Sequence, residues 1–184
     1  MFSIVLMVLA AASPEASPKC SYDLRNTLLL DERAFDQDMN GGWRPLAANE
    51  CYFEAAELIQ KWRESHGAKD STLYWHEGQM RASAGQYSQA VSLFEASRHP
   101  ADQDRKWGWN LYVDGSIAFL KGDMDALRSG RDKLSVLPAP PELEDLKDIN
   151  GNPSRVAWPM NLHVLDAFMR CWGQPYEVAY SCPK

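Results

Sequence analysis

Apolar residues recur at helical spacing along most of the chain from residue 22 to residue 137. The clearest case is the stretch 51–62, in which Ala55, Leu58 and Ile59 fall on one face and charged residues lie between them. A stripe with steps of three and four residues is typical of a helix that packs one face against a core. Gly67 is expected to end this helix, since glycine readily adopts the left-handed conformation at a helix C-terminus.

The same periodicity predicts helices over most of the remaining sequence. Asp70 or Ser71 can cap the one that begins near residue 71, because a short polar side chain can accept hydrogen bonds from the first free amides. The other predicted helices cover residues 22–35, 71–83, 87–99, 107–120, 124–137 and 142–147, one starts at Pro159 and reaches Trp172, and a last one starts at Pro175. No stretch alternates apolar and polar residues in the way a strand does. The predicted fold class is therefore all-α.

Residues 74–97 form a helix, a turn and a second helix with a recognisable spacing of small and large residues. Gly78 lies where two helices can approach closely, Gly85 at the turn, and Ala90 and Phe94 on the inner face of the second helix. This spacing resembles a tetratricopeptide repeat (TPR). The chain resembles a divergent TPR-like protein of the kind that bacteria export.

The segment 111–134 matches the first unit at a shift of 37 residues, which places Gly78 on Gly115 and Gly85 on Gly122. A looser match at a shift of 34 suggests a further unit over the helix 51–62. The resemblance implies a short right-handed stack of antiparallel helix pairs over residues 22–137. A linker over 138–157 and capping helices over 158–184 would follow.

This chain departs from the family pattern at several positions. Glu77 stands where the family usually has leucine, and Arg81 stands where it usually has an aromatic residue. Asp102 occupies the place of the closing proline, and Arg131 occupies the position that corresponds to Phe94. The arginine at position 131 puts the packing of the second helix of the later unit in doubt.

In the TPR family the first helix of each unit lines a concave groove. The matching positions here are Thr72, Trp75, Gln79, Ala82, Ser83, Trp109, Tyr112, Ser116 and Phe119. Aromatic residues bury much area at little entropic cost, so the resemblance implies a groove that binds a protein or peptide. The alternative is that these rings fill the interior of a small helical stack. None of these positions is Lys, Arg or Asn, which TPR proteins use to hold a C-terminal carboxylate.

Residues 1–12 form an apolar run followed by a Pro- and Ser-rich segment. The run is too short to span a bilayer and has the shape of a signal peptide, with Ala10 and Ala12 as the small residues before cleavage. No Lys or Arg precedes the run, which departs from the usual basic start. We therefore expect a periplasmic or secreted protein with a flexible mature N-terminus over residues 13–21 and no stable membrane insertion after cleavage.

The four cysteines, Cys20, Cys51, Cys171 and Cys182, all follow the expected cleavage site. An even number of cysteines in an exported chain suggests disulfides, for which three pairings are possible. The most local pairing joins Cys20 to Cys51 and Cys171 to Cys182. None forms a CxxC motif, so the sequence gives no support for zinc binding or thioredoxin-like chemistry.

The net charge of −6, without any run of Lys or Arg, disfavours nucleic acid and anionic membranes as partners. Asp36, Asp38 and Asn40 spell DxDxNG, the opening of an EF-hand-type calcium loop, but the closing acidic ligand is absent. His76 and Glu77 begin an HExxH motif in which Met80 replaces the second zinc ligand. The sequence thus indicates no catalytic motif and no cofactor.

Three functional hypotheses follow from the sequence. The first is an exported TPR-like binding or scaffold module that uses the aromatic groove. The second is a small inhibitor or immunity-like protein that blocks a secreted enzyme or toxin. The third is an enzyme with an unrecognised site, which an ordered pocket holding several of His76, Glu77, Asp36 and Asp38 would favour. The partner and the oligomeric state are left open.

Overall fold

The computed structural model describes residues 18–147, 151–152 and 156–184. Every regular element in these ranges is a helix, so the predicted all-α class is confirmed. The α-helices are α1 (Leu24–Thr27), α2 (Arg44–Ala48), α3 (Tyr52–His66), α4 (Ser71–Ser83), α5 (Tyr87–Ala96), α6 (Ala101–Asp104), α7 (Trp109–Lys121), α8 (Met124–Ser135), α9 (Leu162–Arg170) and α10 (Tyr176–Tyr180). A π-helical turn, η2 (Arg33–Gln37), and 3-10 turns η1 (Pro18–Cys20) and η3 (Pro141–Leu143) complete the described elements.

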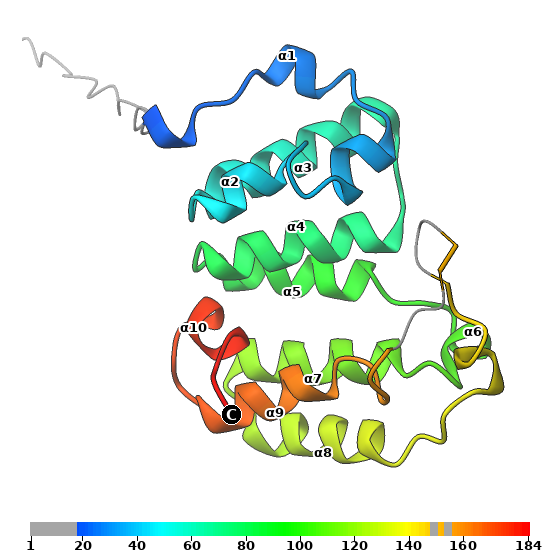
Figure 1. The fold of residues 1–184 in the computed structure, drawn as a ribbon. Helices are drawn as coiled ribbons and strands as arrows, with labels where there is room; N and C mark the ends of the chain where they lie inside the picture. The colour runs from blue at the N-terminus through cyan, green and yellow to red at the C-terminus, as the bar shows by residue number, and fades with distance from the viewer. Residues whose placement is uncertain (1–17, 148–150, 153–155) are drawn as a thin grey trace, which may run out of the picture.

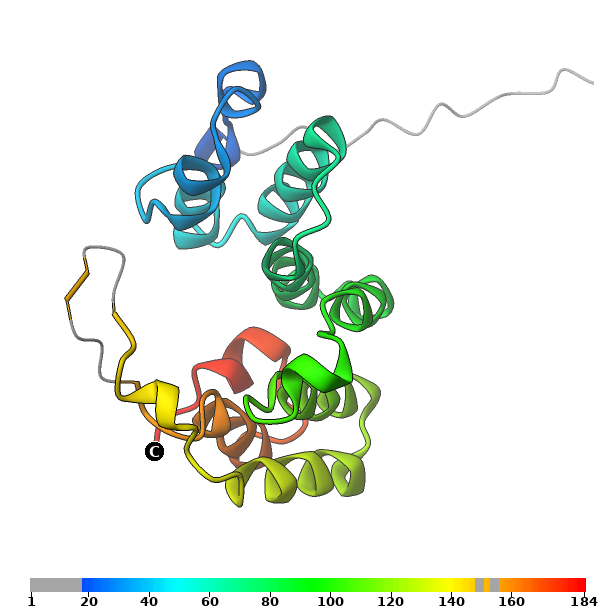
Figure 2. The ribbon, with the colours of Figure 1, turned by 90° about the vertical axis from the view of Figure 1, so that its right-hand side faces the viewer.

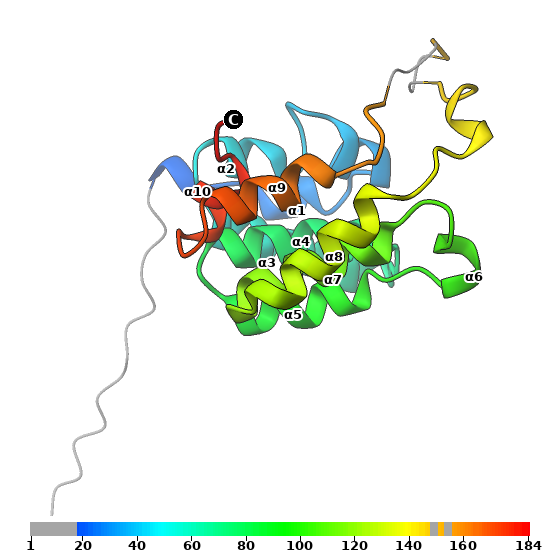
Figure 3. The same ribbon diagram turned by 90° about the horizontal axis from the view of Figure 1, so that it is seen from below.

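The long helices are arranged in layers that follow the chain order (Figure 1). α3 packs on α4, α4 on α5, α5 on α7, and α7 on α8. Helix α9 lies against both α7 and α8, as the view from below shows (Figure 3), and α10 contacts α9 and α4. In the side view of Figure 2 the N-terminal segment and the two C-terminal helices lie on the same side of α4, while α5 lies on the other.

Local chemistry sets the bounds of the central helices as the sequence predicts. Gly67 ends α3 with a left-handed φ of 59°, and its amide hydrogen bonds back into the last turn. The Asp70 carboxylate accepts hydrogen bonds from the amides of Thr72 and Leu73 at the start of α4. Asp123 caps α8 in the same way by accepting from the amide of Ala126.

Gly78 allows the close approach of α4 and α5 that its position predicts. A Cβ atom at Gly78 would lie 2.6 Å from the Phe94 ring, closer than real contacts allow. The corresponding glycine of the later unit, Gly115, faces Leu165 of α9 instead, at 2.7 Å. Helix α8 approaches α7 through its own glycine, Gly130, whose Cβ would lie 3.2 Å from the Gly115 amide.

The buried residues form two clusters that meet at α4. The N-terminal cluster includes Phe35, Trp43 and Trp62 and takes Leu73 from α4. The larger C-terminal cluster takes Trp75 and Ala82 from α4 and extends through α7, α8, α9 and α10. Helix α4 therefore contributes to both cores, which fixes its position between the two ends of the molecule.

The prediction of a single helix over residues 22–35 is wrong. The chain forms α1, breaks, and then forms η2. A continuous helix would join the Ala34 amide to the Leu30 carbonyl. Instead the Ala34 amide donates to the Asp31 carboxylate at 2.8 Å, and the indole N–H of Trp62 donates to the Leu30 carbonyl at 3.1 Å. Both partners of that helical bond are thus engaged elsewhere.

Three further helices differ from the prediction. Helix α7 begins at Trp109 rather than at residue 107, because Gly108 adopts a left-handed φ of 74° and the Asp104 carboxylate accepts hydrogen bonds from the Trp109 and Asn110 amides. The helix expected over 142–147 is the short turn η3. The helix expected from Pro159 begins at Leu162.

Two disulfides, Cys20–Cys51 and Cys171–Cys182, are present, and they are the most local of the three possible pairings. Disulfides persist in oxidising compartments, so both fit an exported location. Within the described ranges, no helix has the length and apolar character needed to cross a bilayer. The predicted signal peptide over 1–12, and the start of the segment 13–21, lie outside the described residues.

Candidate functional site

A cavity of about 290 Å³ opens between α4, α7 and the C-terminal helices. We call it the aromatic pocket. Helices α4 and α7 supply most of its walls, and the loop after α5 and the ends of α9 and α10 supply the rest. Its lining residues are Ser71, Thr72, Trp75, His76, Gln79, His99, Trp109, Tyr112, Asn161 and Tyr180.

Three large rings form the back of the aromatic pocket. The Trp75 ring centroid lies 4.8 Å from those of both Trp109 and Tyr112, and the latter two lie 5.7 Å apart. Trp75 and Tyr112 are buried, whereas Trp109 is half-buried. The indole N–H of Trp109 donates to the Ser97 carbonyl at 2.8 Å, which fixes the ring orientation. These rings therefore act as core residues and as pocket wall at once.

His76 lies on the α4 side of the pocket and contacts a buried carboxylate from the N-terminal segment. Its Nδ1 atom is 2.7 Å from Asp36, and the indole N–H of Trp43 donates to the same carboxylate oxygen at 2.9 Å. The Gln37 side chain donates to the other oxygen. The sequence separation of 40 residues explains why this pair escapes any local motif.

The Asp36 carboxylate is charged in this environment. Burial raises the pKa of Asp36, but the hydrogen bond and charge of His76, the hydrogen bond from Trp43 and the charge of Arg44 together outweigh it. The pKa of Asp36 therefore lies below its ordinary value of 3.8. An ionised carboxylate can only accept, so Nδ1 of His76 carries the proton in this contact.

A second polar pair lies at the opposite rim of the pocket. The Ser71 hydroxyl lies 3.0 Å from Nε2 of His99, and the His99 ring stacks on Trp109 with a centroid distance of 5.5 Å. Asn110 holds the backbone of His99 from both sides, since its amide donates to the His99 carbonyl and its oxygen accepts from the His99 amide. The loop after α5 is thereby locked against the start of α7.

The C-terminal helices close the remaining side of the pocket. Asn161 precedes α9 with a φ of 62°, a left-handed value that asparagine tolerates better than most residues. Its side chain makes no capping hydrogen bond to the first amides of α9. Tyr180 at the end of α10 remains 39% exposed. Burial raises the pKa of the nearby Tyr112 well above its ordinary value, so its phenol stays neutral.

The structure brings five of the nine predicted groove residues together at the aromatic pocket. Those five are Thr72, Trp75, Gln79, Trp109 and Tyr112. Ser83 lies at the other end of α4, and Ser116 is fully buried with its hydroxyl donating to the Tyr112 carbonyl. Phe119 stacks on Phe168 of α9, and Ala82 belongs to the core. The alternative that rings fill the interior applies to Phe119, and Trp75 and Tyr112 also belong to this buried core.

Sequence reasoning missed half of the pocket lining. His76 could have been found, because it lies four residues after Thr72 and three before Gln79 on one helical face. His99, Asn161 and Tyr180 come from a loop and from helix ends in other parts of the chain. Only the tertiary packing brings them to α4, so helical periodicity carries no signal for them.

The residues of the calcium-loop and HExxH-like motifs do not form one site. Asp36 is buried and engaged, which removes it from an open calcium loop with Asp38 and Asn40; the Asp38 carboxylate accepts from the Asn40 amide instead. Glu77 faces away from the pocket and pairs with Arg63 and Arg81. Of the four residues that would favour an enzyme, only His76 and Asp36 come together.

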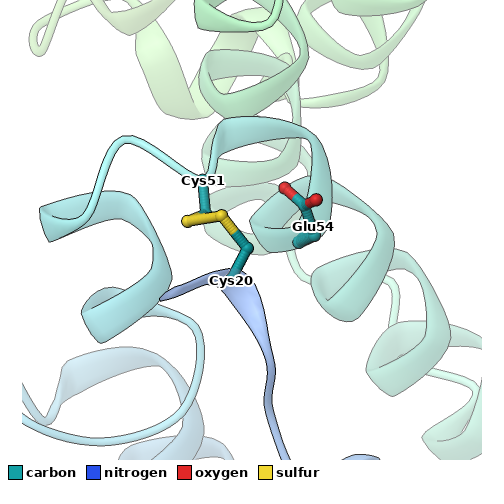
Figure 4. A group of neighbouring side chains, drawn as sticks. All are labelled: Cys20, Cys51 and Glu54. Atoms are coloured by element: carbon teal, nitrogen blue, oxygen red, sulfur yellow. A yellow bond between two sulfur atoms is a disulfide. The ribbon is translucent and has the colours of Figure 1, made fainter. Parts of the chain in front are cut away.

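In the part of the chain that the structure describes, one cluster has the ligand types and spacing for a metal: Cys20, Cys51 and Glu54. Figure 4 shows Glu54 beside the disulfide that joins the two cysteines. Metal binding requires the thiolate form of cysteine. Because the two sulfurs are bonded to each other, this cluster offers only one carboxylate.

Comparison with known proteins finds no matching family model, no matching curated protein and no matching solved structure.

Proposed function

We propose that this protein is an exported, divergent TPR-like module that binds a protein or peptide through the aromatic pocket. One observation carries the proposal. Five residues expected to line the groove from their TPR-like positions meet at a single cavity, and they come from two separate helical units. Such convergence of rings from different helices is typical of a binding site more than of a chance surface hollow.

The arrangement of the helices supports the TPR-like part of the proposal. The pairs α4 and α5, and α7 and α8, are successive helical hairpins, and the first helix of each pair contributes to the pocket. Glycines of α4 and α7 face neighbouring helices at close range in both units. Helix α9 covers α7 and α8, as a capping helix of a repeat stack would.

The physical character of the pocket supports binding of a polypeptide. Trp and Tyr dominate binding hot spots because they offer large rigid surfaces that lose little entropy on contact. Here the rings are already fixed, since Trp75 packs between Trp109 and Phe94 and Trp109 is hydrogen bonded to Ser97. Polar groups of Thr72 and Asn161 lie at the same cavity and can meet a peptide backbone.

Site-specific photocrosslinking in the exported fraction of the host cell tests this function. A photoreactive residue at Thr72, which is exposed at the pocket, should give an adduct with one partner polypeptide. The same residue at Arg128, exposed on α8 and outside the pocket lining, is the matched control and should give none. Adding Tyr180→Leu should weaken the Thr72 adduct. No adduct at Thr72, or equal adducts at both positions, would overturn the proposal.

A further inference from the structure

We propose that the aromatic pocket takes an organic cation, delivered as a lysine or arginine side chain of the bound polypeptide. The inference rests on the proposed function and names the chemical class that the pocket recognises. Three properties of the pocket carry it: rings without a Lys or Arg partner, side-chain oxygens that can accept hydrogen bonds, and a nearby buried carboxylate.

The pocket rings lack a cationic partner within the protein. The described residues contain three cation–π pairs, in which Arg44 lies over Trp43, Arg63 over Tyr74 and Lys106 over Trp107. None of these involves a ring of the pocket, and no Lys or Arg lines it. The faces of Trp and Tyr attract cations through the ring quadrupole, most strongly where water is excluded. A ligand cation would therefore fill a role that no described side chain fills.

The pocket contains side-chain oxygens that can accept hydrogen bonds. The side-chain oxygens of Asn161 and Thr72 line the same cavity. An ammonium or guanidinium group carries only donors, so it complements this set.

Charge also favours a cation over an anion. The chain carries a net charge of −6, and Asp36 is buried directly behind His76. The start of α4 would ordinarily favour an anion, because its first amides are free. Here the Asp70 carboxylate accepts from the Thr72 amide at 2.8 Å and from the Leu73 amide at 3.4 Å. These two amides are occupied by a negative group, so they are not free to bind an anionic ligand.

The test uses the full mature chain and five short peptides. Acetylated, amidated Gly-Gly-X-Gly-Gly peptides carry lysine, arginine, norleucine, glutamine or glutamate at X, and n-butylamine serves as the free cation. Binding is measured by NMR from the indole N–H signals of Trp75 and Trp109. The lysine and arginine peptides should bind about fivefold or more tightly than the norleucine peptide. Equal binding of all five would overturn the inference.

Replacing Thr72 with a charged residue tests the site more directly, because this residue is exposed and can be replaced by either a positive or a negative side chain. Thr72→Lys should weaken binding of the lysine peptide about threefold or more, and Thr72→Glu should strengthen it. Ser129→Lys and Ser129→Glu, on the exposed face of α8, repeat the change in net charge away from the pocket and should leave binding unchanged. Equal effects at both positions would mean that only net charge matters, and would overturn the site.

The outcomes separate this inference from the proposed function. If n-butylamine binds as tightly as the lysine peptide and no polypeptide crosslinks at Thr72, the pocket is a cation site and the polypeptide-binding function fails. If a polypeptide crosslinks at Thr72 but lysine gives no advantage over norleucine, the function stands and the cation inference fails.

Discussion

The imidazole of His76 on α4 lies 2.7 Å from the carboxylate of Asp36 in η2, although 40 residues separate them. Trp43 donates to the same carboxylate, and the Arg44 guanidinium donates to the Asp36 carbonyl. One buried acid thus ties the irregular N-terminal segment to the helix that lines the aromatic pocket. The orientation of His76, and with it one wall of the pocket, depends on this segment.

Replacing Asp36 with asparagine should destabilise the protein. The substitution removes the charge that accepts from His76 and Trp43, and hydrogen bonds to a charged group contribute about 1.5–3 kcal/mol each. We expect the free energy of unfolding at pH 7 to fall by about that amount in total, as measured by urea denaturation. Asp38→Asn, at the exposed neighbouring acid, is the control and should change it little.

The difference between wild type and Asp36→Asn should depend on pH. The pKa of Asp36 is lower in the folded protein than its ordinary value of 3.8. An acid with a depressed folded pKa stabilises the fold above its unfolded pKa and loses that contribution as the pH falls through the folded pKa. The difference should therefore be full above about pH 5 and shrink below pH 4. A constant difference from pH 7 to pH 3 would contradict it.

Adding one methyl group at Gly78 should disrupt the contact between α4 and α5. A Cβ atom there would lie 2.6 Å from the Phe94 ring, and overpacking of this kind costs about 1–3 kcal/mol. We expect Gly78→Ala to lower the free energy of unfolding by that amount. In the double variant with Phe94→Leu, Gly78→Ala should cost less, because the smaller side chain makes room. Purely additive effects would show that the ring is not the cause.

Elements whose ends are decided by neighbouring residues could be predicted from the sequence. Asp70 caps the start of α4 and Gly67 caps the end of α3, because capping needs only a short-range contact. The break between α1 and η2 could not be predicted. It depends on Trp62, which is 32 residues away and takes the Leu30 carbonyl that a continuous helix would use.

The lining residues of the aromatic pocket likewise divide into those that the sequence predicts and those that it does not. Trp75 and Trp109 are groove positions that the TPR resemblance implies, and both line the pocket. Asn161 and Tyr180 lie at helix ends that the sequence identifies only as capping helices. Whether such ends reach α4 depends on how α9 packs on α7 and α8 and how α10 packs on α9, and periodicity alone does not encode that packing.

The two disulfides should differ in their contribution to stability. Cys20–Cys51 closes a sequence separation of 31 residues and Cys171–Cys182 one of 11. In the chain-entropy description these loops correspond to about 4 and about 3 kcal/mol of restricted unfolded-state entropy. Replacing both cysteines of the longer loop with serine should therefore lower the free energy of unfolding more than the same change in the shorter loop. The opposite order, measured by urea denaturation, would contradict this expectation.

The two charged residues that depart most from the TPR pattern form a buried ion network. Glu77 and Arg81 are each only 3% exposed. Glu77 lies 2.5 Å from Arg63 and 3.7 Å from Arg81, and Arg81 also pairs with Glu57 at 2.7 Å. Burial raises the pKa of Glu77, although its two arginine partners act in the opposite direction. The network thus places opposite charges where a TPR-like unit would place a leucine and an aromatic ring.

Replacing Glu77 with leucine should destabilise the protein although leucine suits the family pattern. The change leaves the buried Arg81 guanidinium without one of its carboxylates, and removing one partner of a buried ion pair costs about 3–5 kcal/mol. Glu77→Gln should cost less, because the amide oxygen still accepts hydrogen bonds. In the double variant Glu77→Leu with Arg81→Phe, both charges give way to apolar groups. This variant should recover much of the lost stability in urea denaturation, and a loss equal to the sum of the two single variants would show that the residues do not act as one network.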